Sequence, residues 1–273
     1  MKIFAIRDET DNTRRDLAYL LYYEKDRRFY IELPENADPW EIPLPLSSFA
    51  QKGEYTVDSY WSRLWVQQRI VPPDRQNIGQ ILRDNGLDTY DEYRLLMLSA
   101  GRCEQDDYYL AVVDEGMLPA KIVRRFNRKV EDAVPLGDRC LLVFFRDGTV
   151  RKCDLTEHFE KTRRFSVLAK RSDYFNRVRV QTGGYGVRWD EDLCISDLTL
   201  YKMGKRVPLT ADDFRALASE QVIDSAEASD ILNCSRQYIN ELVKTGKLCP
   251  VKASEKSTLF LKSEVLRRSR RKT

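Results

Sequence analysis

The sequence predicts an α+β fold, and three features of the chain support this prediction. The first 33 residues alternate apolar and polar side chains with the period of β-strands. Asp147-Gly148 and Gly183-Gly184 are typical of the turns of two hairpins in the middle of the chain. Residues 211–273 are predicted to hold short helices and a basic hairpin. Helices mixed with antiparallel hairpins are typical of the α+β class.

Length and composition agree with a folded protein of two or three domains. Of 273 residues, 42% are hydrophobic and 33% are charged, which is ordinary for a soluble protein. The longest apolar runs are far shorter than the roughly 20 residues that a membrane span needs. The first residues carry charge by Arg7 and lack the apolar segment of a signal peptide. We therefore expect a cytoplasmic protein with no membrane partner.

The sequence gives no pattern for a metal site or a catalytic site. The six cysteines stand singly and the chain has one histidine, His158, so the paired ligands of a zinc site are missing. A lone histidine on a short helix is more often a structural or surface residue than a catalyst. Asp190, Glu191 and Asp192 are typical of a solvated turn. We expect no cofactor, no metal and no enzymatic activity.

Residues 1–112 are predicted to form an N-terminal α+β domain that begins with strands. MKIFAIRD and LAYLLYYEKDRRFYIEL supply these strands, with Glu24–Arg27 as the corner of a hairpin. Four prolines then break regular structure, namely Pro34, Pro39, Pro43 and Pro45.

Three helices are expected after these prolines. The first covers TVDSYWSRLWVQQRI with Thr56 as its N-cap, and the spacing of its apolar residues favours a core position for Trp61 and Trp65. The second covers DRQNIGQILRDNG and ends at Gly86. The third covers DTYDEYRLLMLSAG, with Thr89 and Glu92 at the spacing of a capping box.

Residues 113–137 are mixed and basic and are predicted to be a connector. Residues 138–210 then show the pattern of a small α+β domain. CLLVFFRDGTVRKCDL is expected to form a hairpin with a type I′ turn at Asp147-Gly148. One or two short helices over TEHFEKTRRFSVLAK separate it from a second hairpin, NRVRVQTGGYGVRWDEDL, and ISDLTLYKMG closes with a helical turn.

The N-terminal domain and the middle segment each resemble a known family. The strands and the EYRLLMLSAG segment of the N-terminal domain resemble the N-terminal subdomain of HipA-type toxin kinases, although no phosphate loop or catalytic loop follows. The middle segment resembles the bacterial domain of unknown function 2442. Its matching positions are the Phe145–Gly148 turn, Asp154-Leu155, Phe175, Trp189 and Asp192-Leu193. That family commonly has Trp-Pro where this chain has Trp189-Asp190, and the resemblance implies a fold without a known chemistry.

The C-terminal segment VIDSAEASDILNCSRQYINELVKTGKLCPVKAS predicts two helices with a tight corner. Asp224 and Glu227 can form a capping box, Asn233-Cys234 turns the chain, and Ser235 caps the second helix. On the second helix the apolar residues fall on one face and the polar residues on the opposite face. The apolar face holds Tyr238, Ile239, Leu242 and Val243, and the polar face holds Arg236, Gln237, Asn240 and Lys244.

A basic hairpin and a basic tail follow the second helix. KLCPVKAS and TLFLKS are predicted to pair across a short turn, and SEVLRRSRRKT is predicted to be a short helix or a frayed tail. Residues 216–273 hold 11 Lys/Arg and 7 Asp/Glu, which favours an anionic partner.

This C-terminal arrangement resembles the excisionase/MerR-type winged helix-turn-helix. The resemblance covers the EA-x-x-L, SRQYI-x-x-L and GKL positions and the hairpin after them. It implies that Arg236, Gln237 and Asn240 read bases in double-stranded DNA. It also implies contacts with the DNA backbone from Ser235, Tyr238, Lys244, Lys247, Lys252, Lys256, Arg267 and Arg268.

The sequence leaves two functional interpretations open. In the first, the protein is a sequence-specific DNA-binding protein, such as a bacterial or mobile-element transcription regulator or an excisionase-like factor, and binds as a homodimer. In the second, it is an adaptor of antitoxin or anti-defence type whose main partner is another protein, bound through the N-terminal or middle domain. The aromatic residues from Tyr60 to Trp65 motivate this second interpretation.

Overall fold

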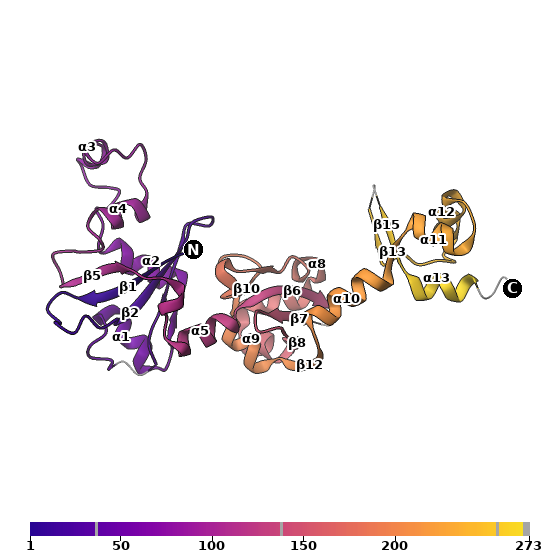
Figure 1. The fold of residues 1–273 in the computed structure, drawn as a ribbon, viewed down its shortest axis with the longest axis horizontal. Coiled ribbons are helices and arrows are strands. Elements are labelled where there is room, and N and C mark those ends of the chain that lie inside the picture. The colour runs from indigo at the N-terminus through magenta and orange to yellow at the C-terminus, as the bar shows by residue number, and fades with distance from the viewer. Residues whose placement is uncertain (36–37, 137–138, 255–256, 270–273) are drawn as a thin grey trace. The chain divides into compact units, whose positions relative to one another are not determined.

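The computed structural model describes residues 1–35, 38–136, 139–254 and 257–269, and Figure 1 shows its course. It contains helices and antiparallel sheets, which confirms the α+β class. The chain divides into two compact units. The first comprises Met1–Asp147 and Arg151–Lys205, and the second comprises Gly148–Val150 and Arg206–Thr273. Across the described part of the chain, no helix has both the length and the apolar composition that a membrane crossing requires.

The first unit begins with a five-stranded antiparallel sheet of order β4-β3-β2-β1-β5. The pairing of Tyr23 with Arg28 places the hairpin corner at Glu24–Arg27, as the sequence predicts. The strands are β1 (Lys2–Asp8), β2 (Ala18–Tyr23), β3 (Arg28–Glu32), β4 (Thr56–Val57) and β5 (Tyr108–Val112).

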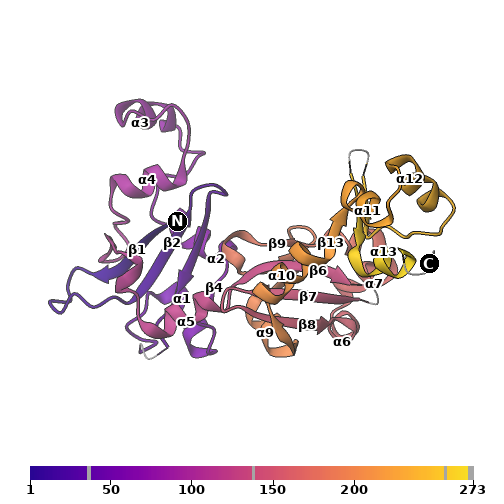
Figure 2. The same cartoon turned by 45° about the vertical axis from the view of Figure 1, so that its right-hand side comes forward.

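Both faces of this sheet are buried, because successive side chains of a strand point to opposite faces. One face packs in a core cluster with side chains from α1, α2 and α4, and the other packs against α5, as Figure 2 helps to show. The helices of this region are α1 (Leu44–Gln51), α2 (Ser59–Gln67), α3 (Ile78–Asp84), α4 (Glu92–Leu98) and α5 (Ala120–Asn127).

Several predicted features of these helices are wrong in detail. Pro43 is the N-cap of α1 and Pro45 lies in its first turn, where a missing N–H costs no hydrogen bond, so these prolines begin a helix instead of breaking structure. Asp58 caps α2, because Thr56 belongs to β4. Asp91, and not Thr89, caps α4.

The two tryptophans of α2 differ in burial. Trp65 is 1% exposed and lies in the core, whereas Trp61 is 49% exposed. The prediction of a core position is therefore wrong for Trp61. The helical stripe that the two residues share identifies one side of the helix, but it does not show where the core ends.

The connector predicted over residues 113–137 is wrong for its described part, because residues 113–136 are folded. A 3-10 turn (Glu115–Met117), α5 and β6 (Val130–Leu136) occupy this segment. Ile122 and Phe126 of α5 are buried against the N-terminal sheet, and Val130 of β6 is buried in the next core. The segment therefore joins two cores directly, and its exposed basic residues conceal this pattern in the sequence.

The middle segment packs short strands and short helices around a second core. β6, β7 (Cys140–Phe145) and β8 (Thr149–Asp154) are neighbours in one sheet, and β9 (Arg179–Val180), β10 (Gly186–Arg188) and β11 (Cys194–Ser196) form another. The helices are α6 (Thr156–Lys161), α7 (Ser166–Lys170), α8 (Ser172–Phe175) and α9 (Asp197–Met203), and a 3-10 turn covers Arg163–Phe165. The β9–β10 hairpin is present as predicted.

The turn at Asp147-Gly148 differs from the predicted type I′ turn. That type needs a positive φ at both central residues, but only Gly148, with φ of 78°, has one here. At the second hairpin Gly183 and Gly184 both have positive φ. A Cβ on Gly184 would meet the carbonyl oxygen of Val130 at 2.3 Å, so the turn needs glycine to approach β6.

A buried charge network joins the N-terminal sheet to the middle segment inside the first unit. Lys129, which is 1% exposed, lies between α5 and β6. Its Nζ is 3.1 Å from Oδ2 of Asp197 on α9 and 3.4 Å from Oε1 of Glu32 on β3. Burial raises the pKa of Asp197, and the nearby Lys129 ammonium acts against that rise. The network and the stacked rings of Tyr30 and Tyr185, 3.7 Å apart, fix the two parts together.

We predict that Lys129→Met strongly destabilises the first unit, because it leaves the Glu32 and Asp197 carboxylates in a buried site without their shared cation. Removing one partner of a buried ion pair costs about 3–5 kcal/mol of unfolding free energy. Urea denaturation followed by circular dichroism measures this loss. Lys121→Met, which removes an exposed lysine paired with Glu35, is the control. Equal stability of the two variants would contradict the prediction.

The second unit is a small helical domain with a three-stranded antiparallel sheet of order β13-β15-β14. The boundary predicted at residue 211 falls five residues after the start of this unit at Arg206. Neither the helix Ala211–Gln221 (α10) nor the strand Val222–Asp224 (β13) was predicted. The elements are β12 (Lys205–Thr210), α10 (Ala211–Gln221), β13 (Val222–Asp224), α11 (Ser225–Leu232), α12 (Arg236–Lys244), β14 (Lys252–Ala253), β15 (Thr258–Leu261) and α13 (Lys262–Ser269).

The caps of α11 and α12 form as the sequence predicts. The Asp224 side chain accepts the N–H groups of Ala226 and Glu227, and Glu227 accepts the N–H of Asp224 in return. Asn233 ends α11 in the left-handed conformation with φ of 47°, which a short polar side chain tolerates. Ser235 then accepts the N–H of Tyr238 and starts α12. The tight corner between the two helices is thus specified by local hydrogen bonds.

We predict that Asp224→Ala lowers the unfolding free energy by about 1 kcal/mol at pH 7, because α11 loses its cap. Asp224→Asn is the matched control and keeps most of that stability, since its side-chain oxygen still accepts. The backbone hydrogen bonds lower the pKa of Asp224 below its usual value of 3.8. The charge-dependent part of the cap is therefore present at neutral pH and is lost as pH falls through the folded-state pKa. Thermal unfolding of the three proteins measures both effects.

Candidate nucleic-acid interface

α12 is held to the second unit by its apolar face. Ile239 is fully buried and Leu242 is 3% exposed, and both belong to one core cluster. Tyr238 and Val243 are half-buried against the same cluster. The other buried members are Ile223, Ala228, Leu232, Leu248, Phe260 and Val265. The helix is therefore anchored along one side by residues from the sheet and from both neighbouring helices.

The opposite side of α12 carries the predicted polar set. Arg236, Gln237, Asn240 and Lys244 are all exposed, as their positions on the helix require. The same surface also includes Glu241, which is exposed and one turn after Gln237. Glu241 is absent from the predicted site residues, although its helical position places it beside them. One acidic side chain thus lies among basic and amide side chains.

The hairpin after α12 is short and exposed. β14 and β15 pair through Lys252↔Leu259, and Ser254 donates its N–H to the carbonyl of Ser257 at 2.8 Å. Phe260 points into the core, whereas Leu261 is 39% exposed. Lys252 is exposed at the start of β14. Lys256, a predicted DNA-backbone residue, lies outside the described residues.

α13 ties the end of the chain back to the loop that follows α12. Arg268 donates from Nη1 to the carbonyl of Lys247 at 3.0 Å, and Glu264 accepts the N–H of Cys249 at 3.2 Å. Arg268 therefore has a structural contact, which the sequence analysis did not anticipate. The Lys247 side chain remains exposed. The backbone of Arg267 belongs to α13, but its side chain lies outside the described structure.

His158 and Asp190, which were considered for catalysis, pack against or hydrogen-bond to neighbouring residues of the fold. The ring of His158 is edge-on to Phe165 at 5.0 Å, and burial, helped by Arg164, lowers its pKa. Oδ1 of Asp190 accepts the N–H groups of Asp192 and Leu193, which makes Asp190 the brace of a turn. All six cysteines have free thiols, and the described side chains include no group of three His, Cys, Asp or Glu arranged to hold a metal.

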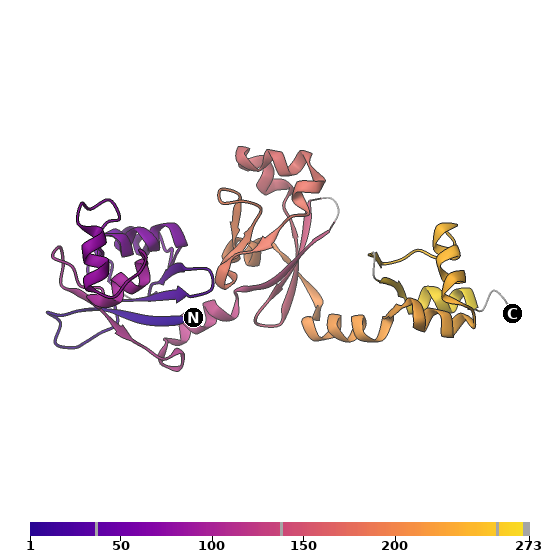
Figure 3. The same ribbon diagram turned by 90° about the horizontal axis from the view of Figure 1, so that it is seen from above.

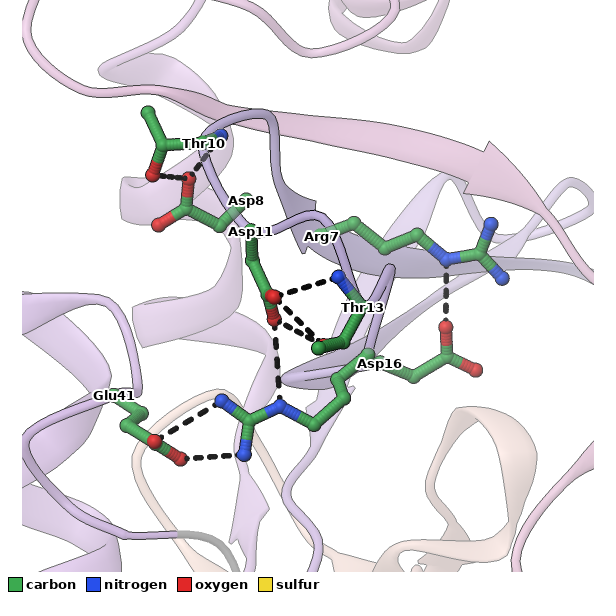
Figure 4. Close-up of polar contacts among 8 residues, drawn as sticks. Arg7, Asp8, Thr10, Asp11, Thr13, Asp16 and Glu41 are labelled. Atoms are coloured by element: carbon green, nitrogen blue, oxygen red, sulfur yellow. Dashed lines mark hydrogen bonds and ion pairs between the residues drawn. The ribbon is translucent and has the colours of Figure 1, made fainter.

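A polar cluster in the β1–β2 loop was not anticipated from the sequence (Figure 4). Asp8 and Asp11 accept the N–H groups of Thr10 and Thr13 at 2.7 and 2.8 Å. Arg15 binds both carboxylate oxygens of Glu41, and Arg7 pairs with Asp16. The members of the cluster form hydrogen bonds and ion pairs with one another, and the pair of Arg15 with Glu41 connects the loop to the segment before α1.

The first unit contains a wide cleft of about 1510 Å³. Its lining includes seven arginines and nine acidic residues, among them Arg28, Arg188 and Glu191. Glu191 already bridges the two arginines at 3.1 Å each. Because its charges are mixed and partly paired, the cleft lacks the uniform positive lining that a nucleic acid needs.

Comparison with known proteins identifies the middle segment. Residues 130–206 match the family described as "Protein of unknown function (DUF2442)". The match confirms the predicted resemblance and starts at β6, eight residues before the predicted boundary at 138. It covers less than a third of the chain and does not reach α12. The comparisons with curated proteins and with solved structures found no significant match. Residues 130–206 are thus similar to a protein family of unknown function, and the match assigns no chemistry to them.

Proposed function

We propose that this chain is a sequence-specific DNA-binding protein that acts without catalysis as a transcription regulator or an excisionase-like factor. The observation that supports the proposal is the two-sided construction of α12. Ile239 and Leu242 fix one side in the core, and Arg236, Gln237 and Asn240 are exposed on the other. A helix anchored in this way presents its polar side chains to the major groove in helix-turn-helix proteins.

The chemistry of these side chains suits base edges. Arginine can donate two hydrogen bonds to guanine, and glutamine or asparagine can bind adenine through two hydrogen bonds. Glu241 can accept a hydrogen bond from the amino group of cytosine. Its carboxylate would also repel a phosphate, which favours a single position of α12 along the DNA groove. The proposal thus assigns base contacts to Arg236, Gln237 and Asn240.

The surroundings of α12 supply groups for the phosphate backbone. Lys244 and Lys247 are exposed at the end of the helix, and Lys252 is exposed on the hairpin that would serve as a wing. Ser235 and Tyr238 lie at the start of the helix, where hydroxyl and backbone N–H groups commonly contact phosphate. Lys256 and Arg267 complete the proposed set on the evidence of sequence alone.

A single module of this size buries a modest DNA surface, so tight binding requires two copies on repeated or palindromic half-sites. We therefore propose that the protein binds as a homodimer. Analytical ultracentrifugation with and without an operator duplex tests this part of the proposal. A strictly one-to-one complex at saturation would exclude it.

We predict that Arg236→Ala/Gln237→Ala weakens binding to the gene's own upstream region in a mobility-shift assay. Each base contact contributes about 1–3 kcal/mol, so the loss of two contacts is expected to weaken binding by at least about thirtyfold. Gln80→Ala/Arg83→Ala is the matched control, because it removes the same side-chain types from the exposed surface of α3. Unchanged affinity in the α12 variant would count directly against the proposed function.

An alternative function, a protein-binding adaptor, is favoured by one observation. A groove of about 250 Å³ between α1 and α2 is lined by Pro45, Leu46, Leu64 and both tryptophans of α2. Trp61 is 49% exposed, and Trp40 before α1 is 85% exposed. Exposed aromatic residues often anchor protein interfaces.

We predict for this alternative that Trp61→Ala abolishes recovery of a stoichiometric protein partner in a pull-down from the native host, because the side chain would anchor that partner. Leu98→Ala is the control, since Leu98 is 54% exposed on α4 and does not line the groove. If the protein recovers specific DNA and no such partner, the adaptor function is excluded.

A further inference from the structure

Two segments of the chain carry an excess of positive charge, and only one of them contains α12. Residues 163–179 hold six Lys/Arg and one Asp, and residues 216–273 hold 11 Lys/Arg and 7 Asp/Glu. The remaining residues hold 29 Lys/Arg and 35 Asp/Glu. The first basic segment lies in the first unit, outside the interface around α12.

This segment forms an amphipathic layer at one side of the middle core. Phe165, Leu168 and Phe175 are buried in that core. The short helices α6, α7 and α8 contact one another in sequence, and Figure 3 shows the salmon-coloured helices gathered on one side of the strands. The basic side chains between the buried ones are exposed, namely Arg163, Arg164, Lys170, Arg171, Arg177 and Arg179. These six residues lie from the 3-10 turn after α6 to the first residue of β9. We name them the α6–α8 basic surface.

Most of this surface is not neutralised by acidic side chains. Arg171 pairs with Asp173 at 2.9 Å, and this is the one ion pair that the six residues make within the described part of the chain. Arg164 lies over the ring of Phe165. The nearby acid Asp190 is bound by Tyr174 and by backbone N–H groups, and Glu191 is held by Arg28 and Arg188. The other four arginines and Lys170 therefore remain available to an external anion.

Exposed hydrogen-bond donors lie between the charges. Ser166, Ser172 and Asn176 are exposed in the same segment. Lysine, arginine, serine and asparagine are the side chains that contact phosphate and sugar in protein–DNA complexes. No aromatic side chain of this segment is exposed for base stacking, which argues against single-stranded nucleic acid. The composition fits the backbone of a duplex.

We propose that the α6–α8 basic surface is a second, sequence-independent contact with the DNA backbone. This inference rests on the proposed function, because it gives the first unit a role in binding the same class of ligand. Two linked contacts raise the affinity through the effective concentration of the second site. The α12 surface supplies the choice of sequence, and the α6–α8 basic surface supplies affinity that depends on salt.

The test uses the full chain and a labelled random-sequence 40-bp DNA duplex, over a range of sodium chloride concentrations. Arg163→Gln/Lys170→Gln/Arg177→Gln is expected to weaken binding on the order of tenfold near physiological salt. It should also reduce the slope of log affinity against log salt by about 2 to 3, since three phosphate contacts are lost. Lys52→Gln/Arg75→Gln/Arg83→Gln is the control, because it removes equal charge from other exposed positions.

The outcomes separate this inference from the proposed function. If the basic-surface variant and its control have the same slope, the inference is overturned, whatever the α12 variant does. If the basic-surface variant loses affinity while Arg236→Ala/Gln237→Ala keeps full sequence discrimination, the proposed function fails and the inference stands. Preferential binding of duplex RNA, or of vesicles with anionic lipid, through the same residues would also overturn it. Thermal unfolding should be unchanged in both triple variants, since every substituted side chain is exposed.

Discussion

The geometry of the second unit depends on one small apolar cluster. Eight buried side chains hold α11, α12 and α13 together with the strands β13 and β15, and Phe260 is fully buried among them. A helix of nine residues is not stable by itself in water. The burial of Ile239 and Leu242 therefore fixes α12 and determines which of its side chains are exposed. The position of the polar side of α12 is thus determined by the apolar side chains buried on its opposite side.

The corner between α11 and α12 was more predictable from sequence than the segment of α5 and β6, for a physical reason. The caps at Asp224 and Ser235 and the turn at Asn233 act over three or four residues, so the sequence encodes them locally. α5 and β6 depend on distant partners, and their exposed basic residues give no local sign of that packing. β13 has three residues and forms through pairing with β15, 37 residues later. Helical spacing alone would have placed Glu241 on the polar side of α12, beside Gln237.

The first unit depends on burial of charge as well as burial of apolar surface. Trp65 could be assigned to the core by its spacing, yet Trp61 could not be assigned to the surface, because the edge of a core is a tertiary property. The pairing of Lys129 with Glu32 and Asp197 joins residues 97 and 68 positions apart. No local pattern distinguishes that lysine from the exposed basic residues beside it.

The position of Lys129 has a consequence for how the chain is divided into domains. The family match begins at Val130, one residue after this lysine, and it includes Asp197 but neither Glu32 nor Lys129. A domain boundary placed at the start of this match would therefore separate Lys129 from Asp197, its partner in a buried ion pair. The segment similar to that family therefore shares a buried charge network with residues outside the match, and a fragment cut at residue 130 would leave Asp197 without its Lys129 partner.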